Sequence, residues 1–321
     1  MPEDTGRSRL LVAGDTTVDL YPEQGKPLEP GGSLRWHVGG TGFNVARAIG
    51  FLGQRSTLLT NIGDDMFGTL LKRYLRTMPV STEFVVQTDK TSPLTLFVPE
   101  EAGGPGWNAW LDGSCFGFFL PESLDFEEFD WLQISGTTLP ESVNQEEMEL
   151  LLKSADRHEV AVSFDINGRA NQWSASSVYR HRVVELLPYC DLVFASEEDL
   201  ALAGVETTVE GLRSLLPDDA TVIVFVTAGE HGATAAEVVN GKLARKEVVE
   251  APEAPVADTA GAGDAFVSAV LKEVLNGKDD LSRLLTVGVA AGTATVATRG
   301  PFEKSDLSRY ESILETLRRQ N

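Results

Sequence analysis

Short apolar runs recur along the chain, and most of them are separated by segments with a three- and four-residue apolar repeat. Runs typical of buried parallel strands lie at 10–15, 56–62, 131–135, 160–165, 192–195 and 221–227. Helical repeats lie at 44–52, 67–76, 145–158, 178–187 and 208–216. Strands that alternate with helices predict βαβ units. The pattern therefore indicates an α/β fold, a three-layer doubly wound sheet that is mostly parallel and has helices on both faces.

Two stretches, 20–38 and 84–119, lack helical periodicity and contain proline, glycine and short alternating apolar segments. Segments 85–87, 94–98, 109–111 and 115–119 have the pattern of antiparallel strands. We expect these insertions to form a small β-sheet lid on a single domain that spans 1–321. Two surface loops are the alternative, but unstructured loops of this length are uncommon in compact domains. Around Asn240-Gly241, 234–239 and 243–249 predict a separate β-hairpin with a type I′ turn.

The composition excludes two classes of partner. The chain has 321 residues and a formal charge of −21, from 48 acidic and 27 basic residues. Such a surface repels nucleic acid and anionic membranes, so neither is expected as a partner. Nine lysines against eighteen arginines, with acidic residues spread along the whole chain, resemble a halophilic protein whose self-repulsion is screened by salt. An acidic mesophilic enzyme is the alternative.

Cysteine and histidine usage predicts a cytoplasmic protein without a metal site built from its own side chains. Cys115 and Cys190 are far apart and match no metal or redox spacing, which suits a reducing compartment. The four histidines form no recognisable metal pair. No apolar run is long enough to span a membrane, and the polar first residues do not resemble a signal peptide.

The segment from Asp258 to Phe266 carries the strongest chemical signal. Gly261, Ala262 and Gly263 directly precede an apolar helical repeat, so free N–H groups and the positive end of the helix dipole face this turn. Phosphate is a common ligand at such a place. Asp264 would repel an anion unless it accepts the proton of a hydroxyl that attacks a phosphoryl group. The pattern favours a phosphotransferase, with an ordinary tight turn as the alternative.

A second glycine-rich motif runs from Gly39 to Asn44 before an amphipathic helix, and Asn44 can exchange hydrogen bonds with hydroxyl groups. With Gly53, Gly63 and the segment 258–269, it resembles both signatures of the ribokinase-like, PfkB-type carbohydrate kinases. The resemblance covers about residues 10–299. The chain contains neither a P-loop nor protein-kinase signatures.

This resemblance implies a ribokinase-like fold with a β-sheet lid, and transfer of the γ-phosphoryl group of ATP to a sugar hydroxyl, with Mg²⁺ bridging the phosphates. Asp264 would be the general base, and the N–H groups of Gly261, Ala262 and Gly263 an anion hole. The sugar would be bound by Asp19, Gly39, Gly40 and Asn44. Residues matching the family's nucleotide site are Thr227, Gly229, Gly232, Val289, Gly292 and Gly300. Lids of this family commonly pair into homodimers, and a need for a monovalent cation such as K⁺ stays open.

Three features point to a branch of the family. Asp165-x-Asn167-x-Arg169, followed by Trp173, is similar to a run of fructokinases and 2-keto-3-deoxygluconate kinases. The run 196–199, Ser-Glu-Glu-Asp, stands where many members carry Asn-x-x-Glu, and a Ser-Glu-Glu version occurs in this branch. Val289 replaces an asparagine that is usual beside adenine. Arg169 would contact ligand oxygens, with a structural ion pair as the alternative.

The second insertion favours a neutral sugar. Residues 91–119 contain no lysine or arginine, whereas an acid sugar needs a cation beside its carboxylate. We therefore expect a neutral ketose, with fructose first, phosphorylated on a primary hydroxyl. The alternatives are a 2-keto-3-deoxygluconate kinase, a nucleoside kinase, and a non-catalytic sugar-binding protein of the same fold.

Overall fold

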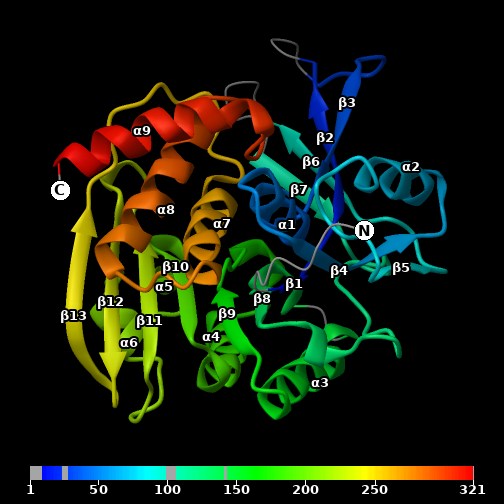
Figure 1. Cartoon of the computed structure of the whole chain (residues 1–321). Coiled ribbons are helices and arrows are strands. Elements are labelled where there is room, and N and C mark those ends of the chain that lie inside the picture. Colours follow the sequence, from blue (N-terminus) through cyan, green and yellow to red (C-terminus); the bar gives the residue numbers. More distant parts are fainter. Residues whose placement is uncertain (1–8, 24–27, 99–105, 141–142, 321) are drawn as a thin grey trace.

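The computed structural model describes residues 9–23, 28–98, 106–140 and 143–320 (Figure 1). Their main sheet has nine strands in the order β13-β12-β11-β10-β9-β8-β1-β4-β5. Neighbours from β11 to β5 are parallel, and β12 and β13 are antiparallel. The strands are β1 (Leu10–Ala13), β4 (Ser56–Gly63), β5 (Val85–Thr88), β8 (Trp131–Ser135), β9 (Ala161–Asp165), β10 (Leu192–Ser196), β11 (Val222–Thr227), β12 (Ala233–Val239) and β13 (Lys242–Val249).

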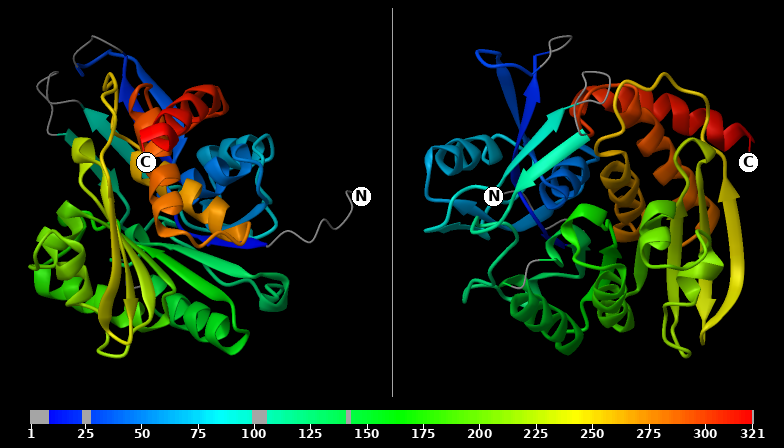
Figure 2. Two further views of the ribbon diagram at one scale, coloured as in Figure 1. Left: turned by 60° about the vertical axis from the view of Figure 1, so that its left-hand side comes forward. Right: turned by 180° about the vertical axis from the view of Figure 1, so that it is seen from behind.

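Helices cover both faces of this sheet and give three layers (Figure 2). One face carries α1 (Thr41–Phe51), α2 (Met66–Leu75), α7 (Ala262–Leu275), α8 (Leu281–Val296) and α9 (Leu307–Gln320). The other carries α3 (Val143–Arg157), α4 (Ser176–Leu186), α5 (Glu197–Leu202) and α6 (Val209–Arg213). Each face has its own apolar core: along β11, Phe225 packs into one and Val224 into the other, as strand alternation requires. In the described part of the chain, no helix is both long and apolar enough to cross a membrane.

A separate small sheet has the order β3-β2-β6-β7 and stands at the end of the main sheet where the parallel strands finish (Figure 1). Its strands are β2 (Thr17–Pro22), β3 (Leu34–Gly39), β6 (Leu94–Val98) and β7 (Gly106–Trp110). The predicted α/β fold with a second, smaller sheet is therefore confirmed. Residues 24–27 and 99–105 of the two predicted insertions lie outside the described residues.

Three details of the prediction were wrong. Segment 85–87 belongs to β5, which pairs parallel with β4 at the edge of the main sheet. Segment 115–119 is not a strand. Residues 115–118 are all buried, and Asn61 holds the segment: its N–H donates to the Gly117 carbonyl at 2.9 Å, and its Oδ1 accepts from Phe119 N–H at 3.0 Å. The hairpin at 234–249 forms, with φ of 46° at Asn240 and 69° at Gly241, but it extends the main sheet beside β11 instead of standing apart.

Helix α1 begins against the end of β1, and two glycines permit this contact. A Cβ on Gly42 would lie 2.6 Å from the Cα of Gly14, and a Cβ on Gly14 would lie 2.7 Å from the Cα of Gly42. Any side chain at either position would push the helix away from the strand. The first turn of α1 therefore lies at the carboxyl edge of the sheet, where α/β proteins bind their ligands.

Candidate active site

The turn that precedes α7 has a conformation that only glycine adopts easily. Gly261 caps the helix with φ of 76°, in the left-handed region. A Cβ at this position would also lie 2.5 Å from the Cβ of Pro301. A side chain at position 261 would strain the backbone and collide with Pro301, so glycine is required here. The conformation of this turn sets the direction of the N–H groups that follow.

This turn leaves backbone donors available to a ligand. The N–H groups of Gly261 and Gly263 have no acceptor in the described part of the chain, whereas Ala262 N–H donates to the Thr259 carbonyl at 3.3 Å. Gly263 is exposed, and a Cβ there would meet open space. The start of α7 is thus an open cradle with the dipole and donors that bind an anion.

Asp264 lies directly behind this cradle and is 5% exposed. Asn44 of α1 donates from Nδ2 to its Oδ2 at 2.8 Å, so the two signature motifs meet at this carboxylate. Burial raises the pKa of Asp264 to about 6, opposed by the Asn44 hydrogen bond and the positive charge of Arg169. A carboxylate with this pKa is ionised at pH 7 and can still accept a proton readily.

Asp19, on β2 of the small sheet, faces the same region. Thr17 Oγ1 donates to its Oδ1 at 2.7 Å, and a Cβ on Gly39 would lie only 1.8 Å from its Oδ2. Gly39 therefore makes room for this carboxylate. Burial raises the pKa of Asp19 to about 7, and the negative charges of Asp15 and Asp264 add to the effect. The structure thus brings Asp19, Gly39, Asn44 and Asp264 together.

A buried hydroxyl network supports the junction of β1, α1 and β8. Thr41 Oγ1 and Thr137 Oγ1 donate to Asp15 Oδ1 at 2.8 and 2.7 Å, and Ser135 bonds to both threonines. Gly40, just before Thr41, has φ of 98°, and a Cβ there would lie 2.4 Å from the Asp15 carbonyl oxygen. These contacts hold the first turn of α1, and hence Asn44, in place.

Arg169 is exposed and has no ion pair within 4 Å among the described residues, so the structural ion pair considered from the sequence is absent there. Its charge nonetheless lowers the pKa of Asp165, Asp199 and Asp264, which places it near all three carboxylates. Burial and the nearby Asp199 hold the pKa of Asp165 well above its ordinary value. The guanidinium is therefore available to a ligand.

The residues predicted for the nucleotide fall into two groups. Gly292 of α8 and Gly300 lie beside the α7 cradle: a Cβ on Gly292 would be 3.4 Å from the Ala262 carbonyl oxygen, and Gly300 N–H donates to Asp258 Oδ2 at 3.0 Å. Thr227 ends β11, and Gly229 and Gly232 follow it with φ of 55° and 91°. Val289 is 5% exposed and packs in the apolar core, and its place beside the adenine stays a prediction.

The chain offers few side chains for a metal ion. Asp199 accepts from Ser196 N–H and Oγ–H, both at 2.7 Å, and from Gly168 N–H at 2.6 Å, so its carboxylate is committed to the start of α5. In the described part of the chain, no three histidine, cysteine or acidic side chains form a metal-binding group. A Mg²⁺ ion at this site would bind mainly through substrate phosphates and water, as is common for this ion.

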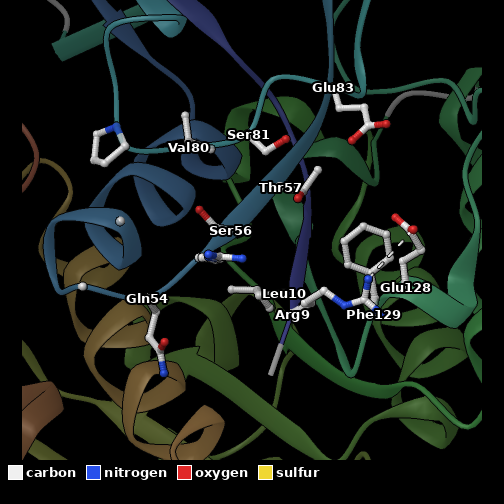
Figure 3. Close-up of a pocket in the computed structure, with 14 residues that line it drawn as sticks. Arg9, Leu10, Gln54, Ser56, Thr57, Val80, Ser81, Glu83, Glu128 and Phe129 are labelled. Carbon is white, nitrogen blue, oxygen red and sulfur yellow. Dashed lines mark ion pairs between the residues drawn. The ribbon is translucent and has the colours of Figure 1, made fainter. Parts of the chain in front are cut away.

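A cavity of about 580 Å³ opens at the opposite edge of the sheet, where β1 and β4 begin (Figure 3). Arg9, Arg55, Ser56, Glu83 and Glu128 line it, and Arg9 and Glu128 form an ion pair at 3.9 Å. It contains none of the predicted site residues. Its mixed charges favour no class of ligand, so the carboxyl edge remains the candidate active site.

The family model for pfkB carbohydrate kinases matches residues 7–306. The chain belongs to the PfkB family. It is therefore a sugar kinase, an enzyme that transfers a phosphoryl group from ATP. A fructokinase of Vibrio alginolyticus is 29% identical over 267 residues, covering 82% of this chain and 83% of that protein. A 2-dehydro-3-deoxygalactonokinase of Haloferax volcanii is 29% identical over 302 residues, 91% of both chains.

Solved structures confirm the ribokinase-like fold. A fructokinase double mutant from Vibrio cholerae, in a form with fructose, ADP and potassium ion bound, superposes with a TM-score of 0.79 at 24% identity and covers 97% of this chain and 98% of its own. The likeness holds over both sheets, because nearly the whole chain is covered. At this identity the comparison concerns the fold alone.

Proposed function

We propose that this kinase transfers the γ-phosphoryl group of ATP to a primary hydroxyl of a neutral ketose, with fructose as the first candidate. The single observation that carries the proposal is the junction at Asp264: a buried carboxylate, bonded to Asn44, stands directly behind a helix N-terminus with free N–H groups. A base and an anion site adjacent to each other are what phosphoryl transfer to a hydroxyl requires.

In the proposed reaction, Asp264 takes the proton of the attacking hydroxyl, whose oxygen forms a bond to the γ-phosphorus as ADP leaves. The N–H groups of Gly261 and Gly263 hold the transferring phosphoryl group, and Ala262 N–H joins them if its long bond to Thr259 opens. Mg²⁺ supplies charge neutralisation on the phosphates when bound. The nucleotide lies along Gly300, Gly292 and the residues after β11.

Asp19 and Asn44 bind sugar hydroxyls in this proposal, with Gly39 and Gly40 giving the ring close access to the backbone. The small sheet acts as a lid that excludes water, since Asp19 projects from it toward Asp264. Arg169, whose charge acts on Asp165 and Asp264, contacts oxygens of the sugar or the phosphates. The free, buried Cys115 and Cys190 are compatible with a cytoplasmic enzyme.

An acid sugar, a 2-keto-3-deoxy sugar acid, is the second candidate, and one observation favours it. The absence of lysine and arginine from 91–119 supports a neutral sugar, but β3 provides an arginine and a histidine. His37 stands opposite Asp19, and Arg35 opposite Tyr21, on the face of the small sheet that bears Asp19. With Arg169, these side chains could pair with a carboxylate. The Haloferax relative is named for such a substrate.

The test is ADP release from Mg·ATP in high KCl with fructose, 2-keto-3-deoxygluconate, ribose, glucose and adenosine. Turnover on fructose that is at least tenfold faster than turnover on each of the other compounds supports the first candidate. Preference for the acid sugar, lost in Arg35→Gln while fructose turnover is unchanged, supports the second. Preference for adenosine, or no turnover on any compound, refutes both. Replacing KCl with NaCl in the same assay tests whether turnover requires K⁺.

The exposed part of the small-sheet face opposite to Asp19 supports a homodimer, whereas Val18, Leu20 and Leu94 on this face pack in or against the core. Leu34, Trp36 and Trp110 are 44, 39 and 53% exposed, and the strand register puts them on the face opposite to Asp19. Exposed apolar groups of this size on one face are typical of an interface. Light scattering of the wild type and of Trp110→Ser tests this part: a dimer that dissociates in the variant supports it, and a monomeric wild type refutes it.

A further inference from the structure

Arg47 is a cation inside the apolar core. It lies on α1, one turn after Asn44, and is only 2% exposed. Its Nη1 pairs with Glu303 Oε1 at 2.7 Å, and its guanidinium lies 5.0 Å from the ring centre of Phe43. Nε and Nη2 are buried and have no acceptor among the described residues. The carboxylate thus partners only one of the three guanidinium nitrogens, and the other two are buried without an acceptor in the described part of the chain.

Stability alone does not explain this residue. A buried guanidinium loses its hydration, and each unpartnered N–H adds to the loss. Replacing a buried ion pair by apolar side chains of similar volume is often neutral or stabilising. The neighbours of Arg47 on α1, among them Phe43, Ala46 and Ile49, are buried and would accept an apolar side chain. The role of the Arg47–Glu303 pair therefore depends on the segments that it connects.

Glu303 ends a short turn, residues 298–303, that packs against the cradle of α7. Gly300 N–H donates to Asp258 Oδ2 at 3.0 Å, and Pro301 occupies the place that a side chain on Gly261 would take. We call 298–303 the C-terminal turn and 258–263 the anion turn. The C-terminal turn therefore shapes the backbone that carries the free N–H groups.

The C-terminal turn is braced at both of its ends by Asp306. Asp306 Oδ2 accepts from Glu303 N–H at 2.8 Å, and Asp306 Oδ1 accepts from Thr298 Oγ1 at 3.1 Å. A shift of Glu303 would thus be passed to Pro301. Helix α1 touches the catalytic region twice from one face: Asn44 holds Asp264, and Arg47 holds Glu303.

We propose that Arg47 is a positioning residue for phosphoryl transfer, which ties the C-terminal turn to α1 so that Asp264 and the anion turn keep one fixed arrangement. The inference rests on the proposed kinase function. The charge of Arg47 also lowers the pKa of Asp264, in the same direction as the Asn44 hydrogen bond. The position of Arg47 orders the turn beside Asp264, and its positive charge favours the ionised form of the Asp264 carboxylate.

The test compares Arg47→Met, Arg47→Lys, Glu303→Gln and the double variant Arg47→Met/Glu303→Gln. We expect Arg47→Met and Glu303→Gln each to lower kcat about tenfold. The sugar KM of each variant should stay within twofold of the wild-type value. The double variant should be no worse than either single variant, and Arg47→Lys should recover part of kcat. Glu303 is half-exposed, so Glu303→Gln removes the negative charge of the pair without disturbing the core.

Amide hydrogen exchange gives a readout that does not need catalysis. The amides to follow are those bonded to the anion turn: Ala265 N–H donates to the Gly261 carbonyl at 2.9 Å, and Gly300 N–H donates to Asp258 Oδ2 at 3.0 Å. Their exchange should accelerate at least fivefold in Arg47→Met and Glu303→Gln, while the thermal midpoint of Arg47→Met stays unchanged or rises. The control is Arg283→Met, because the Arg283–Glu273 pair (2.6 Å) also joins a buried to a partly exposed side chain, near the other end of α7. It should leave kcat and this exchange unchanged.

A lower thermal midpoint with unchanged kcat and unchanged exchange would show that the pair is only structural and would overturn the proposal. Independent, additive losses in the two single variants would overturn it too, because the residues would then act separately. A wild type that phosphorylates no sugar would refute the proposed function. In that case the exchange data would still decide whether Arg47 orders the anion turn.

Discussion

Asp264→Asn keeps the size of the side chain and removes its charge. Asn44 can still donate to an amide oxygen at position 264, as it does to Oδ2 of Asp264 at 2.8 Å, so the contact between α1 and α7 persists. The fold and nucleotide binding are expected to survive. The group that accepts the proton of the sugar hydroxyl is lost, and kcat should fall by about 10²–10⁴.

The same change should stabilise the protein at pH 7. The pKa of Asp264 is about 6 in the folded state against 3.8 as the ordinary value, so the folded state holds this proton more tightly than the unfolded state. Stability contributed by this group is therefore full below pH 4 and is lost as the pH rises to about 6. At 1.36 kcal/mol per pH unit, the loss at pH 7 is at most about 3 kcal/mol. The uncharged variant avoids it.

Steady-state ADP release and urea unfolding at pH 4 and pH 7 measure both effects. The variant should be up to about 3 kcal/mol more stable than wild type at pH 7, and equal to it at pH 4. In the wild type, kcat/KM should fall tenfold per pH unit below about pH 6 as Asp264 takes up its proton. Near-wild-type turnover of the variant, or lower stability at pH 7, would refute the reasoning.

Three further predictions concern other residues. Asp19→Ala should raise the sugar KM at least tenfold and leave the ATP KM within twofold; equal changes in steady-state assays would contradict its place at the sugar. Gly261→Ala forces a side chain into φ of 76° and against Pro301, so kcat should drop at least tenfold and unfolding in urea should become easier by about 1–3 kcal/mol; an unchanged kcat would show that this turn does not hold the phosphoryl group. Asp65 caps α2 and accepts from Ser92 N–H and Oγ–H at 2.7 and 2.8 Å, so Asp65→Ala should cost about 1–3 kcal/mol in the same measurement, and a cost below about 0.5 kcal/mol would contradict this bracing role.

The parallel core of the fold could be predicted from the sequence because burial on both faces leaves a distinctive apolar run. Strand β8 (Trp131–Ser135) has the bounds that its pattern predicts. Segments at the edge of the main sheet were harder to predict from the sequence. A short edge strand such as β5 and a strand of the small sheet have the same local pattern, and only tertiary pairing with β4 separates them. Residues 115–119 were predicted as a strand because they are apolar, but in the structure they are mostly buried without pairing to a neighbouring strand.

The site could be predicted only as separate motifs. Glycine spacing indicated the α7 cradle and the start of α1, but the hydrogen bond between Asn44 and Asp264 joins residues 220 positions apart and depends on how α1 packs on α7. Arg47 carried no signal, because a single arginine in an apolar helix usually reaches solvent. Its burial follows from the tertiary position of Glu303, which no local pattern contains.

The most direct test of the central claim is proton-coupled ³¹P NMR of the products formed from Mg·ATP and fructose by wild type and by Asp264→Asn. We predict that wild type gives ADP and one phosphomonoester resonance split into a triplet by the two protons of a primary carbon. The variant should give at most about one hundredth of that rate. A doublet from a secondary carbon, inorganic phosphate in place of an ester, or equal product from the variant would contradict the account.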